Sequence, residues 1–481
     1  MTKRSVLFSL LVLFAAFNAT AHSGKARFHI IIDTDGAPDD LRTLCMLLGN
    51  REAEVLAVTA SEGALTPSDA ARKISALTAE FYHEGIPTGC GRAVDAPAPI
   101  WRRHAAQTVW ADTPAVEPVA ADGLIARAIE EEEEKVIFVA LGPLTNLYDA
   151  MQKNPDLKSG IERVVWYGSA DGPFSGVNYI TDTVSARFVL ESGIPVCIVS
   201  ENPARTTVVT FEWIDSIEAV GTPYAAKIAG THRSAPLNRL IEANHLKIWD
   251  ELVALYLYRP ELFDTRAVSE TVNICCPKPS VSASELQKAA LAVLRGKPDS
   301  ESRVFFGFPT SKALYAEDVA PIIDSAIAHW GLSEWRAAVL TNELHGHLGI
   351  YATIGVKMGI RAREYFNIGV DDIAVVSFAG NTPPVSCMND GLQVATGGTM
   401  GHGLITAAPV EHPRAEAEFS FKGKSIRLVL KPEYAERIRE DVRRGKEMYG
   451  DSTQPYWQYI RSLALRYWAD FDRHEIFELH R

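Results

Sequence analysis

Residues 30–40 read Ile30-Ile31-Ile32-Asp33-Thr34-Asp35-Gly36-Ala37-Pro38-Asp39-Asp40, and this stretch organises the rest of the chain. The three isoleucines predict a strand buried on both faces, and the strand ends directly in acidic residues. Four carboxylates so close together repel one another unless a cation lies among them. Because all the available ligands are oxygens, they favour a hard cation, Ca²⁺ or Mg²⁺. A solvated acidic turn is the simpler alternative, but it does not explain why the acids follow an apolar strand directly.

The segments around this loop indicate the fold class. Residues 41–48 predict a helix whose first turn contains Asp39 and Asp40, where acidic side chains are favourable. A strand, an acidic loop and a helix in this order place the carboxylates at the carboxyl end of a strand, where open α/β sheets bind ligands. Apolar strands at 55–59, 135–140, 163–167 and 195–199 are expected with helices between them. This alternation predicts an α/β fold, an open, mostly parallel sheet flanked by helices.

Length and charge limit the possible functions. The chain has 481 residues, 47% of them hydrophobic, which is enough for two or three domains with their own cores. Its net charge of −12 makes it a poor binder of nucleic acid. Residues 1–21 combine Lys3 and Arg4, an apolar run and the sequence Ala19-Thr20-Ala21, which is typical of a cleaved secretory signal. We therefore expect secretion or a periplasmic location, with no membrane attachment after cleavage. A retained N-terminal anchor is the alternative.

Two further motifs accompany the acidic loop. The first is Gly142-Pro143-Leu144-Thr145-Asn146, directly after an apolar strand, and the second is Trp249-Asp250, at the start of an apolar helical run. With the Asp-x-Asp-x-x-x-Asp-Asp spacing of residues 33–40, they resemble the nucleoside hydrolases, calcium enzymes that cleave N-ribosides, over roughly residues 27–335. The middle of the loop, Gly36-Ala37-Pro38, departs from the Pro-Gly-x usual in that family.

The resemblance implies a calcium site and a catalytic base. By position, Asp35, Asp40 and Asp250 would ligate the metal, together with the backbone carbonyl of Leu141. Metal coordination lowers the pKa of water steeply, and Asp35 would accept the proton of a water held there. Asp33 would orient the loop rather than touch the metal.

The resemblance also implies substrate contacts, with departures. Asp39 would hold the ribose hydroxyls, and Asn178 aligns with an asparagine that grips ribose. Glu62 stands where the family has a ribose-binding asparagine. Gly176 stands where a ribose-gripping glutamate is expected, so the chemical nature of the substrate at its 5′ end stays undecided.

Trp249 indicates which base is the leaving group. Many nucleoside hydrolases place a histidine before the late aspartate as leaving-group acid, whereas the purine-preferring members place a tryptophan there. An indole can stack on a purine but has no proton to give at neutral pH, so stacking and solvent would have to replace the acid. Residues 92–120 predict a long loop over the site. Trp101 or Trp110 in this loop either stacks on a base or packs in the core.

A second set of motifs lies near the C-terminus. The sequences His345-Gly346-His347 and Cys387-x-x-Asp390 resemble the family of the formylmethanofuran dehydrogenase E component over roughly residues 340–430. Two histidines and a distant cysteine are a suitable set of ligands for a transition metal, and we expect His345, His347 and Cys387 to hold zinc. Gly398 replaces a cysteine of that family, so a histidine pair without metal is the alternative.

These observations predict a signal peptide at 1–21, a hydrolase-like domain at 27–335, a smaller α+β domain at 340–430 and a helical extension at 431–481. The glutamate run at 130–134 is expected to be a solvated face. The predicted function is hydrolysis of the N-glycosidic bond of a small nucleoside-like substrate, with purine nucleosides preferred. The alternatives are a ligand-binding or sensor module with little turnover, or a second metal-dependent activity in the C-terminal domain. Homo-oligomerisation is left open.

Overall fold

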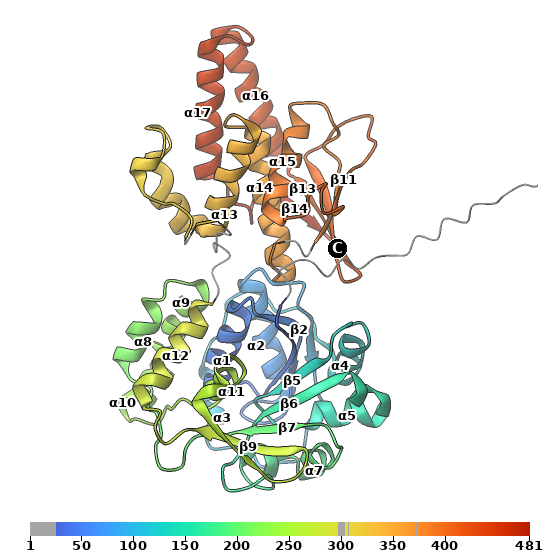
Figure 1. The fold of residues 1–481 in the computed structure, drawn as a ribbon, viewed down its shortest axis with the longest axis vertical. Helices are drawn as coiled ribbons and strands as arrows, with labels where there is room; N and C mark the ends of the chain where they lie inside the picture. The colour runs from blue at the N-terminus through green and yellow to red at the C-terminus, as the bar shows by residue number, and fades with distance from the viewer. Residues whose placement is uncertain (1–25, 297–303, 306, 371–372) are drawn as a thin grey trace, which may run out of the picture.

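The computed structural model describes residues 26–296, 304–305, 307–370 and 373–481. The predicted signal peptide at 1–21 lies outside the described residues. Figure 1 shows two regions, one coloured blue to yellow-green and the other gold to red. No helix in the described ranges is both long enough and apolar enough to cross a membrane.

The first region is built on a nine-stranded sheet with the order β4-β3-β2-β1-β5-β6-β7-β9-β8. All neighbouring strands run parallel except the edge strand β8, which is antiparallel to β9. The predicted open, mostly parallel sheet is therefore confirmed. Its strands are β1 (Phe28–Thr34), β2 (Ala53–Ala60), β3 (Thr88–Cys90), β4 (Val119–Ala120), β5 (Val136–Ala140), β6 (Ile161–Tyr167), β7 (Val196–Val199), β8 (Phe263–Ala267) and β9 (Val272–Pro277).

Helices cover both faces of this sheet. Ile30 and Ile32 pack into the core on one face and Ile31 into the core on the other, as expected for a strand buried on both sides. The helices are α1 (Pro38–Gly49), α2 (Pro67–Glu80), α3 (Arg102–Gln107), α4 (Ala121–Glu130), α5 (Thr145–Lys153), α6 (Val177–Thr181), α7 (Thr183–Leu190), α8 (Phe211–Glu218), α9 (Pro223–His232), α10 (Ala235–Glu242), α11 (Glu251–Tyr258) and α12 (Ala283–Arg295).

The second region is an α+β unit around a five-stranded mixed sheet with the order β11-β10-β12-β13-β14. Its strands are β10 (Ala374–Ser377), β11 (Ile405–Ala407), β12 (Glu416–Phe421), β13 (Lys424–Leu430) and β14 (Phe477–His480). Its helices are α13 (Ile323–His345), α14 (Ile350–Phe366), α15 (Met388–Thr396), α16 (Pro432–Tyr449) and α17 (Gln454–Asp470). In Figure 1, α16 and α17 form a hairpin at the end of the molecule far from the nine-stranded sheet.

The core of the second region extends beyond the boundaries expected from the sequence. Buried apolar side chains from Val319 to Phe477 form one cluster. A division at 335–340 would cut through α13, because Trp335 is buried in this core and stacks on Trp468 with ring centroids 4.6 Å apart. The segment 431–481 is likewise part of the domain rather than an extension, since it supplies α17 and the edge strand β14.

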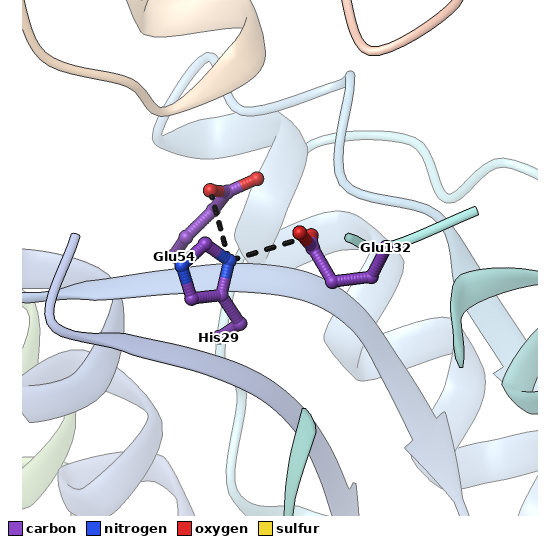
Figure 2. A group of neighbouring side chains, drawn as sticks. All are labelled: His29, Glu54 and Glu132. Atoms are coloured by element: carbon purple, nitrogen blue, oxygen red, sulfur yellow. Dashed lines mark ion pairs between the residues drawn. The ribbon is translucent and has the colours of Figure 1, made fainter. Parts of the chain in front are cut away.

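The two regions meet at the amino ends of the central strands. Lys422, in the turn between β12 and β13, forms ion pairs with Glu54 at 2.7 Å and Glu132 at 2.6 Å. Figure 2 shows His29, at the start of β1, between the same two carboxylates, with Nδ1 3.5 Å from Glu54 and 3.3 Å from Glu132. The Glu132 side chain is only 3% exposed, so the expectation that the glutamate run is a solvated face is wrong at this residue.

Further contacts from α14 and from the segment after α17 hold the same interface. Arg361 donates to Glu84 at 2.7 Å, and the Gly85 amide donates to the carbonyl of Tyr365 at 2.8 Å. The ring of Tyr82 stacks on that of His474 with centroids 3.4 Å apart. The second region therefore docks at the edge of the sheet opposite the carboxyl ends of the strands, where the acidic loop lies.

Candidate active site

The acidic loop spans the end of β1 and the first turn of α1. Asp40 Oδ2 accepts hydrogen bonds from the backbone amides of Asp35 and Gly36, each at 3.1 Å, and from the Thr34 hydroxyl. Gly36 has φ of 82°, and a Cβ there would lie 2.7 Å from the Leu65 side chain. The turn therefore needs glycine at this position for its conformation and for space.

Three carboxylates converge at this loop. Oxygen atoms of Asp39, Asp40 and Asp250 all lie within 4.8 Å of one another. Asp250 comes from the N-terminal end of α11, far along the chain. Oδ1 of Asp40 and Oδ1 of Asp250 are buried and have no hydrogen-bond partner in the described part of the chain. Buried carboxylate oxygens without a partner are costly unless a ligand satisfies them.

The electrostatics of the cluster support a cation site. Burial raises the pKa of Asp250 well above its ordinary value, and the charges of Asp40 and Asp39 raise it further. Burial, together with the charge of Asp40, raises the pKa of Asp35 well above its ordinary value and that of Asp39 to about 7. A bound cation would remove this repulsion, and an all-oxygen set suits Ca²⁺. The chemistry of these residues therefore fits the ion implied by the resemblance, but the convergent group contains Asp39 where Asp35 was expected, and Asp35 lies beside it in the cavity wall.

The Gly-Pro-Leu-Thr-Asn motif supports the loop from the neighbouring strand β5. The Leu141 amide donates to the carbonyl of Asp33 at 2.8 Å. The Leu141 carbonyl accepts from Asn178 Nδ2 at 2.7 Å, and since a carbonyl has two lone pairs, one remains for a metal. Asn146 Nδ2 donates to Asp33 Oδ1 at 2.7 Å, and the Thr59 hydroxyl donates to the same oxygen at 2.5 Å. Asp33 is thus held by the protein itself, consistent with an orienting role.

A buried ionic cluster joins α1 to α11. Arg42 pairs through Nε with Glu251, contacts His232 Nε2 at 2.7 Å and donates to the carbonyl of Lys247 at 2.8 Å. The other oxygen of Glu251 accepts from the Trp249 amide at 3.1 Å. We call Arg42, Glu251 and His232 the Arg42 cluster. It ties the helix that carries Asp39 and Asp40 to the segment that carries Asp250, and sequence reasoning missed it.

A cavity of about 630 Å³ opens over the acids. Asp35, Asp39 and Asp40 lie in its wall, and so do Trp249 and Trp101. The loop at 92–120 contributes Trp101, which is 39% exposed and so can contact a ligand. Trp110, by contrast, is 1% exposed and packs in the core, which settles the choice that the sequence left open for it.

Two residues predicted to contact the substrate already have hydrogen-bond partners within the protein. The Glu62 carboxylate accepts from Arg102 at 2.6 Å, and the same guanidinium nitrogen donates to the Gly63 carbonyl at 2.7 Å. Glu62 therefore anchors α3 to the end of β2 instead of lining the cavity, which corrects the expected role. Asn178 does line the cavity, but its Nδ2 donates to the carbonyls of Leu141 and Tyr167, so only its Oδ1 is left for a substrate.

The structure also adds residues that the motifs did not indicate. His104, Tyr167, Ser200, Glu201 and His245 lie in the cavity wall. They come from four separate segments, so no spacing in the sequence connects them. The available signal was weak: Ser200 and Glu201 are polar residues directly after an apolar strand, β7.

The predicted ligands in the second region lie around α15 and the end of α13. His345 Nδ1 is 2.7 Å from Asp390, and the rings of His345 and His347 have centroids 4.3 Å apart. His345 Nε2 is buried and has no hydrogen-bond partner among the described residues. Within the described ranges, the groups of ligand atoms lying within 4.8 Å of one another do not include His345, His347 and Cys387 together.

Comparison with known families agrees with this geometry. Residues 30–302 match the family described as inosine-uridine preferring nucleoside hydrolase. Residues 344–477 match the family described as FmdE, molybdenum formylmethanofuran dehydrogenase operon.

Among curated proteins, the chain is similar to the pyrimidine-specific ribonucleoside hydrolase RihA of Escherichia coli O1:K1 / APEC, with 28% identity over 263 residues, covering 49% of this chain and 81% of RihA. Among solved structures, it is similar to the purine-preferring ribonucleoside hydrolase from Gardnerella vaginalis, with 17% identity, a TM-score of 0.43 and coverage of 56% of this chain and 99% of that one. The inosine-uridine preferring nucleoside hydrolase from Bacillus anthracis has 16% identity, a TM-score of 0.43 and the same coverage of both chains.

Proposed function

The chain belongs to the inosine-uridine preferring nucleoside hydrolase family, and from this premise we propose that it is an exported, calcium-dependent enzyme that hydrolyses purine nucleosides. Membership makes it an N-glycosyl hydrolase; calcium, purine preference and export are the proposed refinements. The observation that carries the proposal is the convergence of Asp39, Asp40 and Asp250 beneath a large cavity, with two buried carboxylate oxygens left without partners among the described residues.

Each acid has a separate task in this proposal. Asp35, Asp40, Asp250 and the Leu141 carbonyl would hold the metal, which when bound supplies positive charge that makes a water easier to deprotonate. Asp35 lies in the cavity wall and is the proton acceptor. Asp39 accepts hydrogen bonds from the ribose hydroxyls, and this polarises the sugar toward its oxocarbenium-like transition state.

Two tryptophans support the purine preference. Trp249 and Trp101 lie in the wall of the same cavity, on different elements. An indole offers a wide apolar face for stacking, and a purine fills more of that face than a pyrimidine does. Trp249 gives no proton, so expulsion of the base relies on stacking and on solvent as acid.

The competing candidate is a pyrimidine nucleosidase, because RihA is named as pyrimidine-specific. A reducing-sugar assay of the purified mature chain with inosine, adenosine, guanosine, uridine and cytidine separates the two. We expect kcat/KM for the best purine nucleoside to exceed that for uridine by about 10-fold or more, the discrimination that a few well-packed atoms provide. Equal values, or a preference for uridine, would contradict the purine assignment.

Export rests on the sequence of residues 1–21 alone. Expression with the full leader should give a mature protein that begins at His22, in the periplasmic or extracellular fraction. Intact-mass measurement of that fraction tests the point. A protein that keeps Met1 and pellets with membranes would indicate a retained anchor.

For the second region we propose a transition-metal site, with zinc the expected ion. His345 Nδ1 contacts Asp390, and its Nε2 is buried without a hydrogen-bond partner in the described part of the chain, which leaves this nitrogen available to a metal. His347 and Cys387 are the proposed partners. Elemental analysis of the full chain should find about one equivalent of zinc, and His345→Asn should lose it. An unchanged zinc content in that variant, or no zinc in the wild type, would favour a histidine pair without metal.

A further inference from the structure

A second group of metal-ligand side chains lies at the amino ends of the central strands, where the two regions meet. His29 in β1 and Glu54 in β2 are paired in register, so their side chains lie next to each other on one face of the sheet. Glu132 precedes β5, the strand on the other side of β1. Ligand atoms of the three residues lie within 4.8 Å of one another, and Figure 2 shows both carboxylates directed at the imidazole. The acidic loop begins at the other end of β1, roughly 15 Å along the strand, so the two groups are separate.

The imidazole of His29 has bonding capacity to spare. Its side chain is 11% exposed, and Nδ1 lies 3.5 Å from Glu54 and 3.3 Å from Glu132. Both contacts are too long or too poorly directed for a strong hydrogen bond to this buried nitrogen. A buried ring nitrogen that is only weakly satisfied is unfavourable, and a ligand placed between it and the two carboxylates would remove that cost.

A cation from the second region already occupies the position between the carboxylates. The Lys422 ammonium lies 2.7 Å from Glu54 and 2.6 Å from Glu132. Lys422 has φ of 42°, in the left-handed region that a residue with a side chain rarely adopts, and Gly423 follows with φ of 74°. Such a conformation persists where surrounding contacts hold it in place. The turn between β12 and β13 therefore presents a tethered cation to a position that accepts cations.

Charge and ligand type indicate which free cation fits the same position. The ammonium balances only one of the two carboxylate charges, whereas a divalent cation balances both. One imidazole nitrogen and two carboxylate oxygens are ligands that Zn²⁺ accepts, with a fourth position left for water. Ca²⁺ and Mg²⁺ prefer oxygen ligands alone, so the nitrogen of His29 favours zinc over them.

We propose that His29, Glu54 and Glu132 form a zinc site, and that the Lys422 ammonium occupies this site while the two regions are docked. Zinc and Lys422 compete for the same two carboxylates. Zinc binding therefore releases the turn between β12 and β13 and loosens this contact between the regions. The site lies at the edge of the sheet opposite the cavity, and the proposal does not depend on nucleoside hydrolysis.

The test is a zinc titration of the full chain by equilibrium dialysis and elemental analysis, in saturating calcium so that the acidic loop is filled. It compares the wild type with Lys422→Met and with Lys424→Met as the matched control. Lys424 lies in the same hairpin, but its ammonium contacts the Gly85 carbonyl, at 3.4 Å. We expect Lys422→Met to take up about one additional equivalent of zinc, at a free zinc concentration at least about 10-fold lower than the wild type and the control require. The tethered ammonium is removed only in Lys422→Met, and a tethered competitor acts at a high effective concentration.

Two further measurements identify the ligands and guard against a variant that fails to fold. Adding His29→Gln to Lys422→Met should abolish the additional equivalent. In the wild type, high zinc should speed hydrogen–deuterium exchange of the amides around Lys422, whereas His29→Gln alone, which keeps both ion pairs of Lys422, should show no response to zinc. Equal zinc binding by the wild type and Lys422→Met, additional zinc that survives His29→Gln, or exchange at the turn that zinc does not change in the wild type would overturn the proposal.

Discussion

At the scale of single residues, Asp35 carries the most specific role. Its carboxylate accepts from the Ala37 amide at 3.3 Å and lies in the cavity wall. Asp35→Asn keeps an oxygen that can accept this hydrogen bond, so the fold should survive. Because the attacking water loses its proton acceptor, kcat should fall by about 100-fold or more. The measurement is steady-state hydrolysis of inosine at saturating calcium, with calcium content determined in parallel. Activity within about threefold of the wild type, at equal occupancy, would refute the assignment.

Trp249 gives a second prediction at this scale. Its stacking interaction should strengthen as the bond to the base breaks, so Trp249→Ala should lower kcat more than it raises KM. Trp457→Ala is a matched control, since that indole is exposed in the second region. A Trp249→Ala enzyme whose KM alone changes would place the indole in substrate binding rather than in leaving-group expulsion.

At the scale of elements, the site depends on how α1 and α11 are held together. Arg42→Met leaves Glu251 buried without its partner, and breaking such a pair typically costs about 3 to 5 kcal/mol. We therefore expect a lower free energy of unfolding and weaker calcium binding, because Asp250 loses its fixed position relative to Asp39 and Asp40. Denaturant unfolding and calorimetric calcium titration measure the two effects.

A double variant gives the decisive comparison. Arg42→Met with Glu251→Leu removes both charges, so it should be more stable than Arg42→Met alone. A double variant at least as unstable as the single one would show that the helices are not joined through this ion pair.

The helices and strands are largely predictable from the sequence, but the side-chain contacts that join them are not. The isoleucine strand, the acidic loop and the following helix appear as local patterns, because periodicity and turn residues act over a few positions. In the sequence, Arg42 is one charged residue in a largely apolar helix, and its partners lie about 200 residues away. Asn178 lines the cavity and Glu62 does not, and the hydrogen bonds of both residues depend on packing that no local pattern encodes.

At the scale of the whole molecule, the interface between the regions should respond to acid. Burial alone would raise the pKa of Glu132. Hydrogen bonds from His29 and Lys422 outweigh this effect and lower that pKa from 4.5 to about 2. A lowered folded-state pKa stabilises the protein above about pH 4.5, and this contribution is lost as pH falls toward 2. The difference in free energy of unfolding between wild type and Lys422→Met should therefore be largest at pH 7 and shrink between pH 4.5 and 3. A difference that stays constant in urea unfolding over this range would contradict the role of the pair.

The division into two regions also shows where sequence reasoning stops. Motifs in the sequence indicate where the candidate site of each region lies, but they do not indicate at which residues its hydrophobic core begins and ends. Val319 and Trp335 precede the first motif of the second region, and Trp468 follows the last, yet all three belong to its core. A core is defined by contacts in space, so its ends are visible only when the fold is known.

The central claim is that the converging acids make this chain a calcium-dependent nucleoside hydrolase. The most direct test is release of base from inosine by protein stripped with a chelator and then titrated with calcium. We predict no turnover in the stripped protein and full recovery at about one equivalent of bound calcium per chain, with Asp250→Asn shifting the titration to higher calcium. Full activity of the stripped protein, with no calcium detected by elemental analysis, would contradict the claim.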